Sequence, residues 1–362
     1  MTPGLVRAPK LGLRLAGKPV AGCVSAEVEG NSHYQADTWR AELALNAPGG
    51  RDLATWGKDD LVGQLFTVLM GLDDDVRPMI VGEADKIEVQ PERGTVSVSG
   101  RDLTARLIDH RIQEAFQNKT ASEVAVTLAQ RRGLTPKVAA TTTPVSRYYQ
   151  TDHDQVSHDQ NSRSGTEWDL LTKLAQFEGF DCYVSGTELH FEKAADPAKA
   201  EPWGVRWDGN AKRSQVMNLR LDRSLTLAKD VLVEVRSWSS AQGRGFTKRS
   251  PKGAAAGSGS GGGKNGPAQR FTFRFPNLTE DQAQKKADQL RADISKHERT
   301  LSFDCPANLD LTPRDVLAVS GVGGWDQRYF VSSIRRRVSM DGGFPMTVSA
   351  KNHSPESEAP TT

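Results

Sequence analysis

Two segments of the chain, 250 residues apart, repeat one pattern of apolar and polar residues. LVGQLFTVLMG begins at Leu61 and LTPRDVLAVSG begins at Leu311, and the two align without gaps. At the same spacing, Val81 further along corresponds to Val331. Alternating sequences resemble one another easily, so chance similarity between strand-rich segments is the alternative. If the repeat is real, the chain contains two domains of one β design.

Alternation of apolar and polar residues dominates residues 11–100, which form short segments separated by turn residues. Val24, Ala26 and Val28 fall on one face of their segment, and Glu27 falls on the other. This period of two is typical of a half-buried antiparallel sheet. The same pattern returns after Pro202 and continues to the last strand, PMTVSAK. The sequence therefore predicts a β-rich α+β chain.

The period changes in the middle of the chain, where two helices are expected. Thr120 followed by Glu123, and Thr166 followed by Asp169, both have the spacing of a capping box. The two segments repeat each other 46 residues apart, and each runs into a candidate strand. This indicates a small α/β domain made of a helix-strand repeat.

Two other segments interrupt the second β pattern. An amphipathic helix is expected to begin at Leu278 and to end near His297. Residues 251–267 are rich in Gly and Ser and are expected to form a flexible loop without preferred structure.

Composition excludes several classes of protein. The 362 residues carry 47 basic and 45 acidic side chains, so the net charge of +2 creates no field that would attract DNA or an acidic membrane. The apolar runs are too short to span a bilayer. Cys23, Cys182 and Cys305 are odd in number and widely spaced, which predicts reduced thiols. We expect no role at a membrane.

His153, Asp154 and His158 are the strongest candidates for a metal site, because imidazole and carboxylate can share a divalent ion. The two histidines lie in a polar stretch without an HExxH frame, so a solvated loop is the favoured interpretation. The segment GSGSGGGKNG around Lys264 lacks the glycine and the Ser or Thr of a phosphate-binding loop. We therefore expect no catalytic residue, no metal and no cofactor.

Arg335, Arg336 and Arg337 lie within an alternating strand and cannot all face the same way. An exposed strand with an ion pair between subunits is the expected explanation. Trp203 and Trp207 suggest a carbohydrate platform, although core or interface anchors are the commoner role of tryptophan.

A short motif follows a Val-Ser-Val-Ser strand and resembles a signature of phage baseplate hub proteins of the Mu-like and late control gene D families. Its residues are Gly100, Arg101, Asp102, Leu103, Thr104 and Asp109. In those families the Gly-Arg-Asp segment closes a first β domain and leads into a short helical stretch. The resemblance covers most of the chain through the order of its elements, and the Gly/Ser-rich 251–267 insert departs from it.

The resemblance implies two tail-tube-like antiparallel β-barrel or sandwich domains that flank the small α/β domain. The expected domains are 1–110, 111–200 and 201–351, with a polar tail at 352–362. Such a protein forms a homotrimer, in which six β domains make a pseudo-hexameric ring between the sixfold tail tube and the threefold central spike. A chain with one copy of the domain could not adapt a trimer to a hexamer.

The partners that the resemblance implies are the tail tube or a tube-initiator protein, the central spike protein and neighbouring baseplate or wedge proteins, with DNA only in transit through the lumen. The location is the tail baseplate of the virion, assembled in the cytoplasm of the host bacterium. One alternative is the hub of a type VI secretion system, a tailocin or a gene transfer agent. An alternative of another class is a peptidoglycan-binding or cell-wall-degrading protein.

Overall fold

Strands from both ends of the chain build most of the protein. The structure is a computed structural model that describes residues 8–32, 34–112, 116, 119–142, 165–194, 200–210, 214–225, 231–239, 244–251, 262–263, 266–267, 269–275, 278–295 and 298–352. The first group of strands is β1 (Pro9–Leu15), β2 (Lys18–Val20), β3 (Cys23–Asn31), β4 (Thr38–Ala44), β5 (Leu65–Leu72), β6 (Asp75–Gln90) and β7 (Thr95–Asp102). The last group is β11 (Trp203–Arg206), β12 (Met217–Arg223), β18 (Arg299–Pro306), β19 (Val316–Ser320), β20 (Gln327–Ser339) and β21 (Pro345–Asn352).

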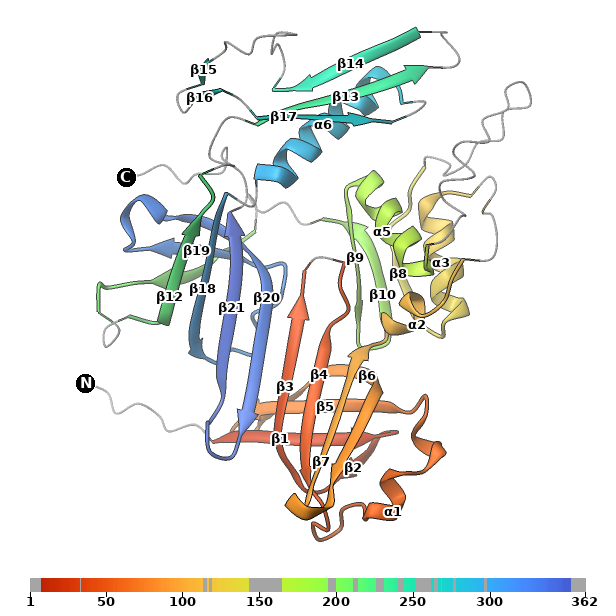
Figure 1. Ribbon diagram of the computed structural model, residues 1–362, viewed down its shortest axis with the longest axis vertical. Helices are drawn as coiled ribbons and strands as arrows, with labels where there is room; N and C mark the ends of the chain where they lie inside the picture. The colour runs from red at the N-terminus through yellow and green to blue at the C-terminus, as the bar shows by residue number, and fades with distance from the viewer. Residues whose placement is uncertain are drawn as a thin grey trace.

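These two groups of strands, which we call the N-terminal half and the C-terminal half, join in one sheet (Figure 1). Within the described residues the sheet has 13 strands, in the order β12-β18-β21-β20-β3-β4-β7-β6-β5-β1-β2, with β19 beside β20 and β11 beside β19. Alternate residues of the strands point into one core, where Phe66, Met70, Val98, Tyr329 and Val348 are fully buried. The β-rich α+β class expected from the sequence is confirmed.

The order of strands is the same in the two halves. The N-terminal half runs β3-β4-β7-β6-β5-β1, and the C-terminal half runs β12-β18-β21-β20-β19-β11. The outermost pair differs in direction, because β1 is antiparallel to β5 whereas β11 is parallel to β19. The repeat in the sequence therefore corresponds to a repeated strand order.

The register of the strands shows which residues of β6 and β20 occupy equivalent positions in the two halves. In β6 the pairing with β7 shifts by one residue between Ala84 and Lys86, and in β20 the pairing with β21 shifts between Val331 and Ser333. Ala84 pairs with Gly100, and Val331 pairs with Ala350. Ala84, rather than Val81, therefore occupies the place of Val331. A gapless alignment misses this offset because the hairpins that precede and follow the strand differ in length.

The middle of the chain forms a separate layer of helices on a small sheet, seen at the right of Figure 1. Its helices are α3 (Ala121–Arg131) and α5 (Glu167–Glu178), and its sheet has the order β8 (Thr135–Val138), β10 (Glu188–Lys193), β9 (Phe180–Ser185). Both helices begin with a complete capping box, at Thr120 and at Thr166, as predicted.

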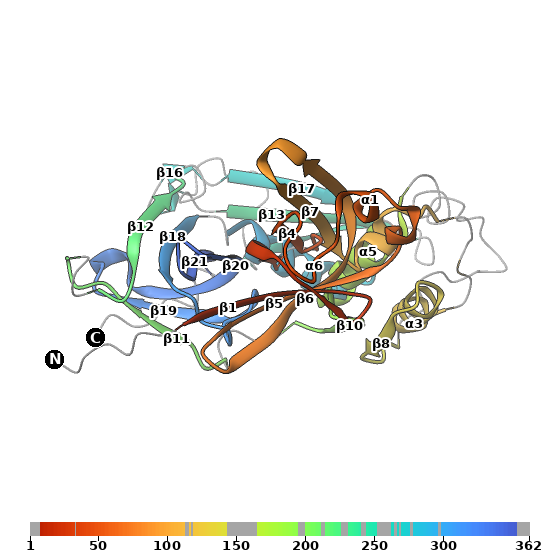
Figure 2. The ribbon, with the colours of Figure 1, turned by 90° about the horizontal axis from the view of Figure 1, so that it is seen from below.

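A third unit has a sheet of its own (Figures 1 and 2) and contacts the middle layer, where Lys286 and Gln289 donate to the carbonyl of Gln176 at 3.0 and 2.9 Å. Its strands pair in the order β14 (Arg244–Ser250), β13 (Val231–Ser239), β17 (Gln269–Arg274), and α6 (Glu280–Ser295) covers one face of them. Val233, Val235, Ala283 and Ala287 are buried in its own core. The short pair β15 (Gly262–Gly263) and β16 (Gly266–Pro267) lies between β14 and β17 in the chain. The second β domain expected from the sequence, 201–351, includes this unit.

Candidate functional site

The motif that carries the family resemblance lies where the N-terminal half meets the middle layer. Gly100, Arg101 and Asp102 are the last residues of β7, and the chain then enters the short helix α2 (Ala105–Ile108). Asp109 follows as the C-cap residue of α2. Each residue of the motif can be assigned a contact at this junction.

Gly100 sits where β6 lies close against β7. A Cβ atom at this position would collide with the carbonyl oxygen of Glu83 and would lie 2.9 Å from the Cα of Ala84. Asp85, directly after Ala84, is the extra residue of the β6 bulge. A side chain at position 100 would push the two strands apart at the bulge, so the position requires glycine.

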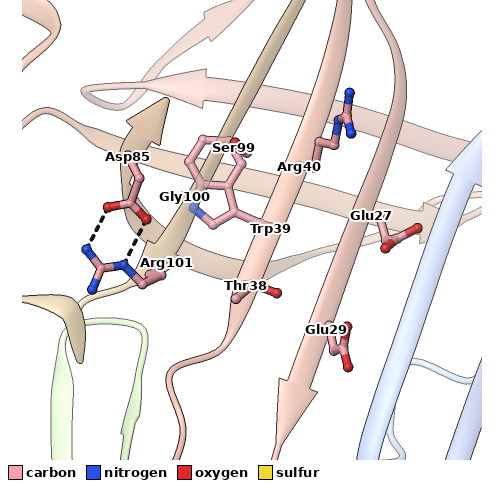
Figure 3. Close-up of a pocket in the computed structure, with 9 residues that line it drawn as sticks. All are labelled: Glu27, Glu29, Thr38, Trp39, Arg40, Asp85, Ser99, Gly100 and Arg101. Atoms are coloured by element: carbon pink, nitrogen blue, oxygen red, sulfur yellow. Dashed lines mark hydrogen bonds and ion pairs between the residues drawn. The ribbon is translucent and has the colours of Figure 1, made fainter. Parts of the chain in front are cut away.

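Arg101 holds the bulge against the end of α2. Its guanidinium donates to both carboxylate oxygens of Asp85, at 2.8 and 2.7 Å, as Figure 3 shows. It also donates to both oxygens of Asp109 at 3.0 Å. The hydrogen bonds to Asp85 and then to Asp109 raise the pKa of Arg101 above its usual value. Two bidentate ion pairs of this kind fix geometry more than they add stability, because the acids are largely exposed.

Asp102 turns the chain from the strand into the helix. Its carboxylate accepts a hydrogen bond from the hydroxyl of Thr104 at 2.9 Å and one from the Thr104 backbone N–H at 3.2 Å. The backbone N–H of Asp102 donates to the carbonyl of Asp37 at 2.9 Å. Burial raises the pKa of Asp102, and the neighbouring Asp37 carboxylate raises it further.

Leu103 anchors the junction in the middle layer. Its side chain and that of Leu107 are buried in the core formed by α3, α5 and the small sheet. Trp168 of α5 adds a second connection by donating its indole N–H to the carbonyl of Tyr34 at 2.7 Å. The chemistry of the motif is therefore that of a rigid joint.

The polar face of the N-terminal half is slightly hollowed beside Arg101 (Figure 3). The residues that line the hollow are Glu27, Glu29, Thr38, Trp39, Arg40, Asp85, Ser99, Gly100 and Arg101. Its carboxylates contact guanidinium groups, Asp85 that of Arg101, and Glu27 and Glu29 that of Arg335. This is the arrangement of a structural ion-pair network.

The candidate metal residues His153, Asp154 and His158 lie outside the described residues. Among the residues that the structure does describe, no group of three or more His, Cys, Asp or Glu side chains could hold a metal ion. Cys23, Cys182 and Cys305 are free thiols. In the described part of the chain no helix has the length and apolarity needed to cross a membrane.

The joint between the two halves is the second prominent contact. Residues 333–339 of β20 pair antiparallel with β3, so that Arg335 lies opposite Glu29 and Arg337 lies opposite Glu27. Arg335 forms an ion pair of 2.8 Å with Glu29. The ion pair expected between subunits at this strand is thus made within one chain.

Arg336 points to the other face of β20, as the alternation predicted. Its guanidinium donates to the carbonyl oxygens of Asn308 and Leu311. Burial lowers the pKa of Arg336 to about 10. The two tryptophans of the suggested carbohydrate platform also differ: Trp203 is 37% exposed, whereas Trp207 packs against the main core.

The fold is shared with tail proteins of known structure. The 43 kDa tail protein of prophage MuSo2 from Shewanella oneidensis superimposes with a TM-score of 0.68 at 16% identity, over 97% of this chain and 100% of that chain. A tail protein from Neisseria meningitidis MC58 gives a TM-score of 0.65 at 16% identity, over 95% and 96% of the two chains.

An Escherichia coli component of the type VI secretion system, itself described as similar to the bacteriophage T4 tail proteins gp27 and gp5, gives a TM-score of 0.55 at 10% identity, over 96% of this chain and 78% of that chain. No protein-family model matches the sequence. No curated protein matches it significantly. At the level of the fold, the resemblance to tail and hub proteins found in the sequence is confirmed.

Proposed function

We propose that this chain is the baseplate hub of a contractile phage tail. Three copies form a pseudo-hexameric ring that connects the sixfold tail tube to the threefold central spike. The observation that carries the proposal is the repeated strand order of the two halves, which β20 and β3 join edge to edge. One chain then presents two near-equivalent units, and a trimer presents six.

The work of such a hub is done by surfaces. Ring closure is a head-to-tail contact repeated around an axis, and permanent contacts of this kind bury on the order of 2,000 Å² or more. The partners are the tail tube or a tube-initiator protein, the central spike and neighbouring baseplate or wedge proteins. The location is the virion baseplate, assembled in the host cytoplasm. The motif at Gly100–Asp109 supports a structural role without catalysis, because its contacts serve to join two layers.

A second candidate is the hub of a related injection machine, such as a type VI secretion system, a tailocin or a gene transfer agent. The likeness to the type VI secretion component favours this reading, since both machines use the same fold. The genes that neighbour this one discriminate the two: tail-tube, sheath and capsid genes indicate a phage, and secretion genes without capsid genes indicate the alternative.

Mass photometry over a concentration series tests the ring. We expect a species of three times the 39.5 kDa chain mass to grow with concentration, and negative-stain images of that species to show a pore. A protein that stays monomeric at every concentration refutes a preassembled ring. We also expect weak DNA binding, and a salt-sensitive submicromolar affinity contradicts a lumen through which DNA only passes.

A further inference from the structure

The strand pairing that joins the two halves of the chain is a template for a second strand pairing. The outer edge of β20 is shared by two strands: β19 pairs with residues 327–330, and β3 pairs with residues 333–339. β6 is used in the same way at its start, where β5 pairs with residues 75–83. Beyond that point, residues 84–90 of β6 have β7 on one side and no described strand on the other.

The shared register identifies which residues of the open edge correspond to the occupied one. β7 and β21 correspond residue by residue, with Val98 at the place of Val348, and their partners across the sheet are Ile87 and Ile334. Counting on from Ile87, Glu88 takes the place of Arg335 and Val89 that of Arg336. Residues 86–90 of β6 therefore match the part of β20 that β3 covers.

β12 is the counterpart of β3. β3 pairs with β4, which pairs with β7, and β12 pairs with β18, which pairs with β21. When the paired residues are followed from strand to strand, Leu221 occupies the position of Val28, and Asp222 occupies that of Glu29. β12 is the last strand of the large sheet within the described residues, so its outer edge has no described partner.

The two unpaired edges belong to opposite sides of the continuous run of strands from β12 to β6. Figure 1 shows this run from β12 at the left to β6 at the right, and in Figure 2 β12 also lies in the left part of the molecule. None of residues 84–90 is buried, although Ile87 and Val89 pack partly against the main core. Unpaired edges of this length invite pairing with another chain.

We propose that β12 of a second copy of this chain pairs antiparallel with residues 86–90 of β6, with Leu221 of the second copy opposite Val89. This inference rests on the proposed ring and names the contact that closes it. The occupant is a second copy because the joint of β20 with β3 supplies the template for both edges. The contact uses different surfaces on the two copies, so it is head-to-tail and closes into a ring when the rotation per copy is one third of a turn.

The side chains of the two edges suit this pairing. Leu219 and Leu221 of β12, like Ile87 and Val89 of β6, pack partly against the main core of their own half. In the proposed register Val89 meets Leu221 of the second copy and continues the apolar face of the sheet from one copy to the next.

The polar face carries charges in alternation. Within one chain, Lys86 lies 2.8 Å from Glu88, and Arg220 lies 2.9 Å from Asp222. When the edges pair, Lys86 is diagonal to Asp222 of the second copy, and Glu88 is diagonal to Arg220 of the second copy. Long side chains reach diagonal neighbours in a sheet. Lys86 and Arg220 therefore offset the repulsion between Glu88 and Asp222, which lie directly opposite each other.

Disulfide trapping tests both the contact and its register. The double variant Val89→Cys/Leu221→Cys places two thiols directly opposite each other between copies, at a separation that a disulfide spans. Under mild oxidation we expect covalent dimers and trimers on a non-reducing gel. The single variants Val89→Cys and Leu221→Cys, which keep the three native thiols, should give none. The matched control Val89→Cys/Leu219→Cys, two residues out of register, should cross-link at least tenfold more slowly.

The outcomes separate this inference from the proposed function. If mass photometry shows trimers but Val89→Cys/Leu221→Cys cross-links no faster than the control, the ring stands and the β6–β12 register is wrong. If the unmodified protein stays monomeric and no variant cross-links, both the ring and the pairing fail. Fast cross-linking in trimers supports both, and similar circular dichroism of the two double variants shows that each is folded.

Discussion

Replacing Asp37 with asparagine should stabilise the protein at neutral pH. Asp37 accepts a hydrogen bond from the backbone N–H of Asn31 at 2.7 Å, and its own carbonyl binds the N–H of Asp102. Burial raises the pKa of Asp37 to about 6, from 3.8 for an unperturbed aspartate. Asparagine keeps the oxygen that Asn31 contacts and removes the partly buried charge, so the Asp37→Asn variant isolates the cost of that charge.

The sign and size follow from proton linkage. A raised pKa means that the folded protein binds the proton more tightly than the unfolded chain does. The stabilisation is complete below the unfolded pKa near 3.8 and is lost as the pH rises through the folded pKa near 6. A shift of roughly two units, at about 1.4 kcal/mol per unit, corresponds to about 3 kcal/mol. Relative to wild type, Asp37→Asn should therefore gain up to about 3 kcal/mol between about pH 4 and pH 7.

Urea denaturation at a series of pH values measures this gain as the difference in the free energy of unfolding between the two proteins. Asp74→Asn, at an exposed position of the β5–β6 turn, is the matched control and should track wild type. A difference between Asp37→Asn and wild type that is constant across the pH range refutes the reasoning, because only an ionising group with a shifted pKa produces a slope.

Three further substitutions test the joint and the cores. Arg132→Ala removes hydrogen bonds of 2.7 and 2.8 Å from Glu167, whose side chain is 2% exposed, and leaves Arg131 at 3.4 Å as the remaining cation. It should lower the free energy of unfolding by about 1.5–3 kcal/mol in urea titrations; no change would show that Arg131 alone satisfies the carboxylate. Leu171→Ala opens a cavity at a fully buried site and should cost about 2–5 kcal/mol by the same measurement. Gly100→Val should lower the melting temperature far more than Gly204→Val, where a Cβ meets nothing within 4 Å; equal effects would contradict the close approach of β6 and β7.

Local patterns in the sequence were sufficient for most of the elements. Alternation located the long strands of both halves, and the capping boxes at Thr120 and Thr166 located the first residues of α3 and α5. These signals are local, since a strand shows its buried face every second residue and a cap lies within one turn of its helix. The order of the elements then sufficed to suggest the fold.

Local patterns did not predict which strands pair with one another. β13 and β17 alternate like the strands of the large sheet, yet they pair with each other, and β13 pairs with β14 on its other side, beneath α6. Only the free energy of packing against α6 distinguishes the two sheets, and that depends on residues far apart in the chain.

The sequence predicted where the motif lies but not how its residues connect the two layers. The sequence marked Gly100, Arg101 and Asp102, but the role of Arg101 depends on Asp85, the extra residue of a bulge. Bulges leave little trace in a single sequence, because they shift the alternation by one residue within an otherwise regular strand. The equivalent bulge in β20 adds no offset between the two halves, because both strands carry the extra residue. Val81 was matched with Val331 because the hairpins before the two strands differ in length.

The pairing of β20 with β3 has a consequence for synthesis on the ribosome. β3 ends at Asn31, and its partner begins at Ser333, so the ribosome adds about 300 residues before the edge of β3 can be covered. At roughly 5–20 residues per second this takes on the order of half a minute. During that time one edge of β3 is unpaired in the nascent chain. In a product truncated before β20 this edge stays unpaired. Premature termination should therefore yield aggregates instead of a soluble first half.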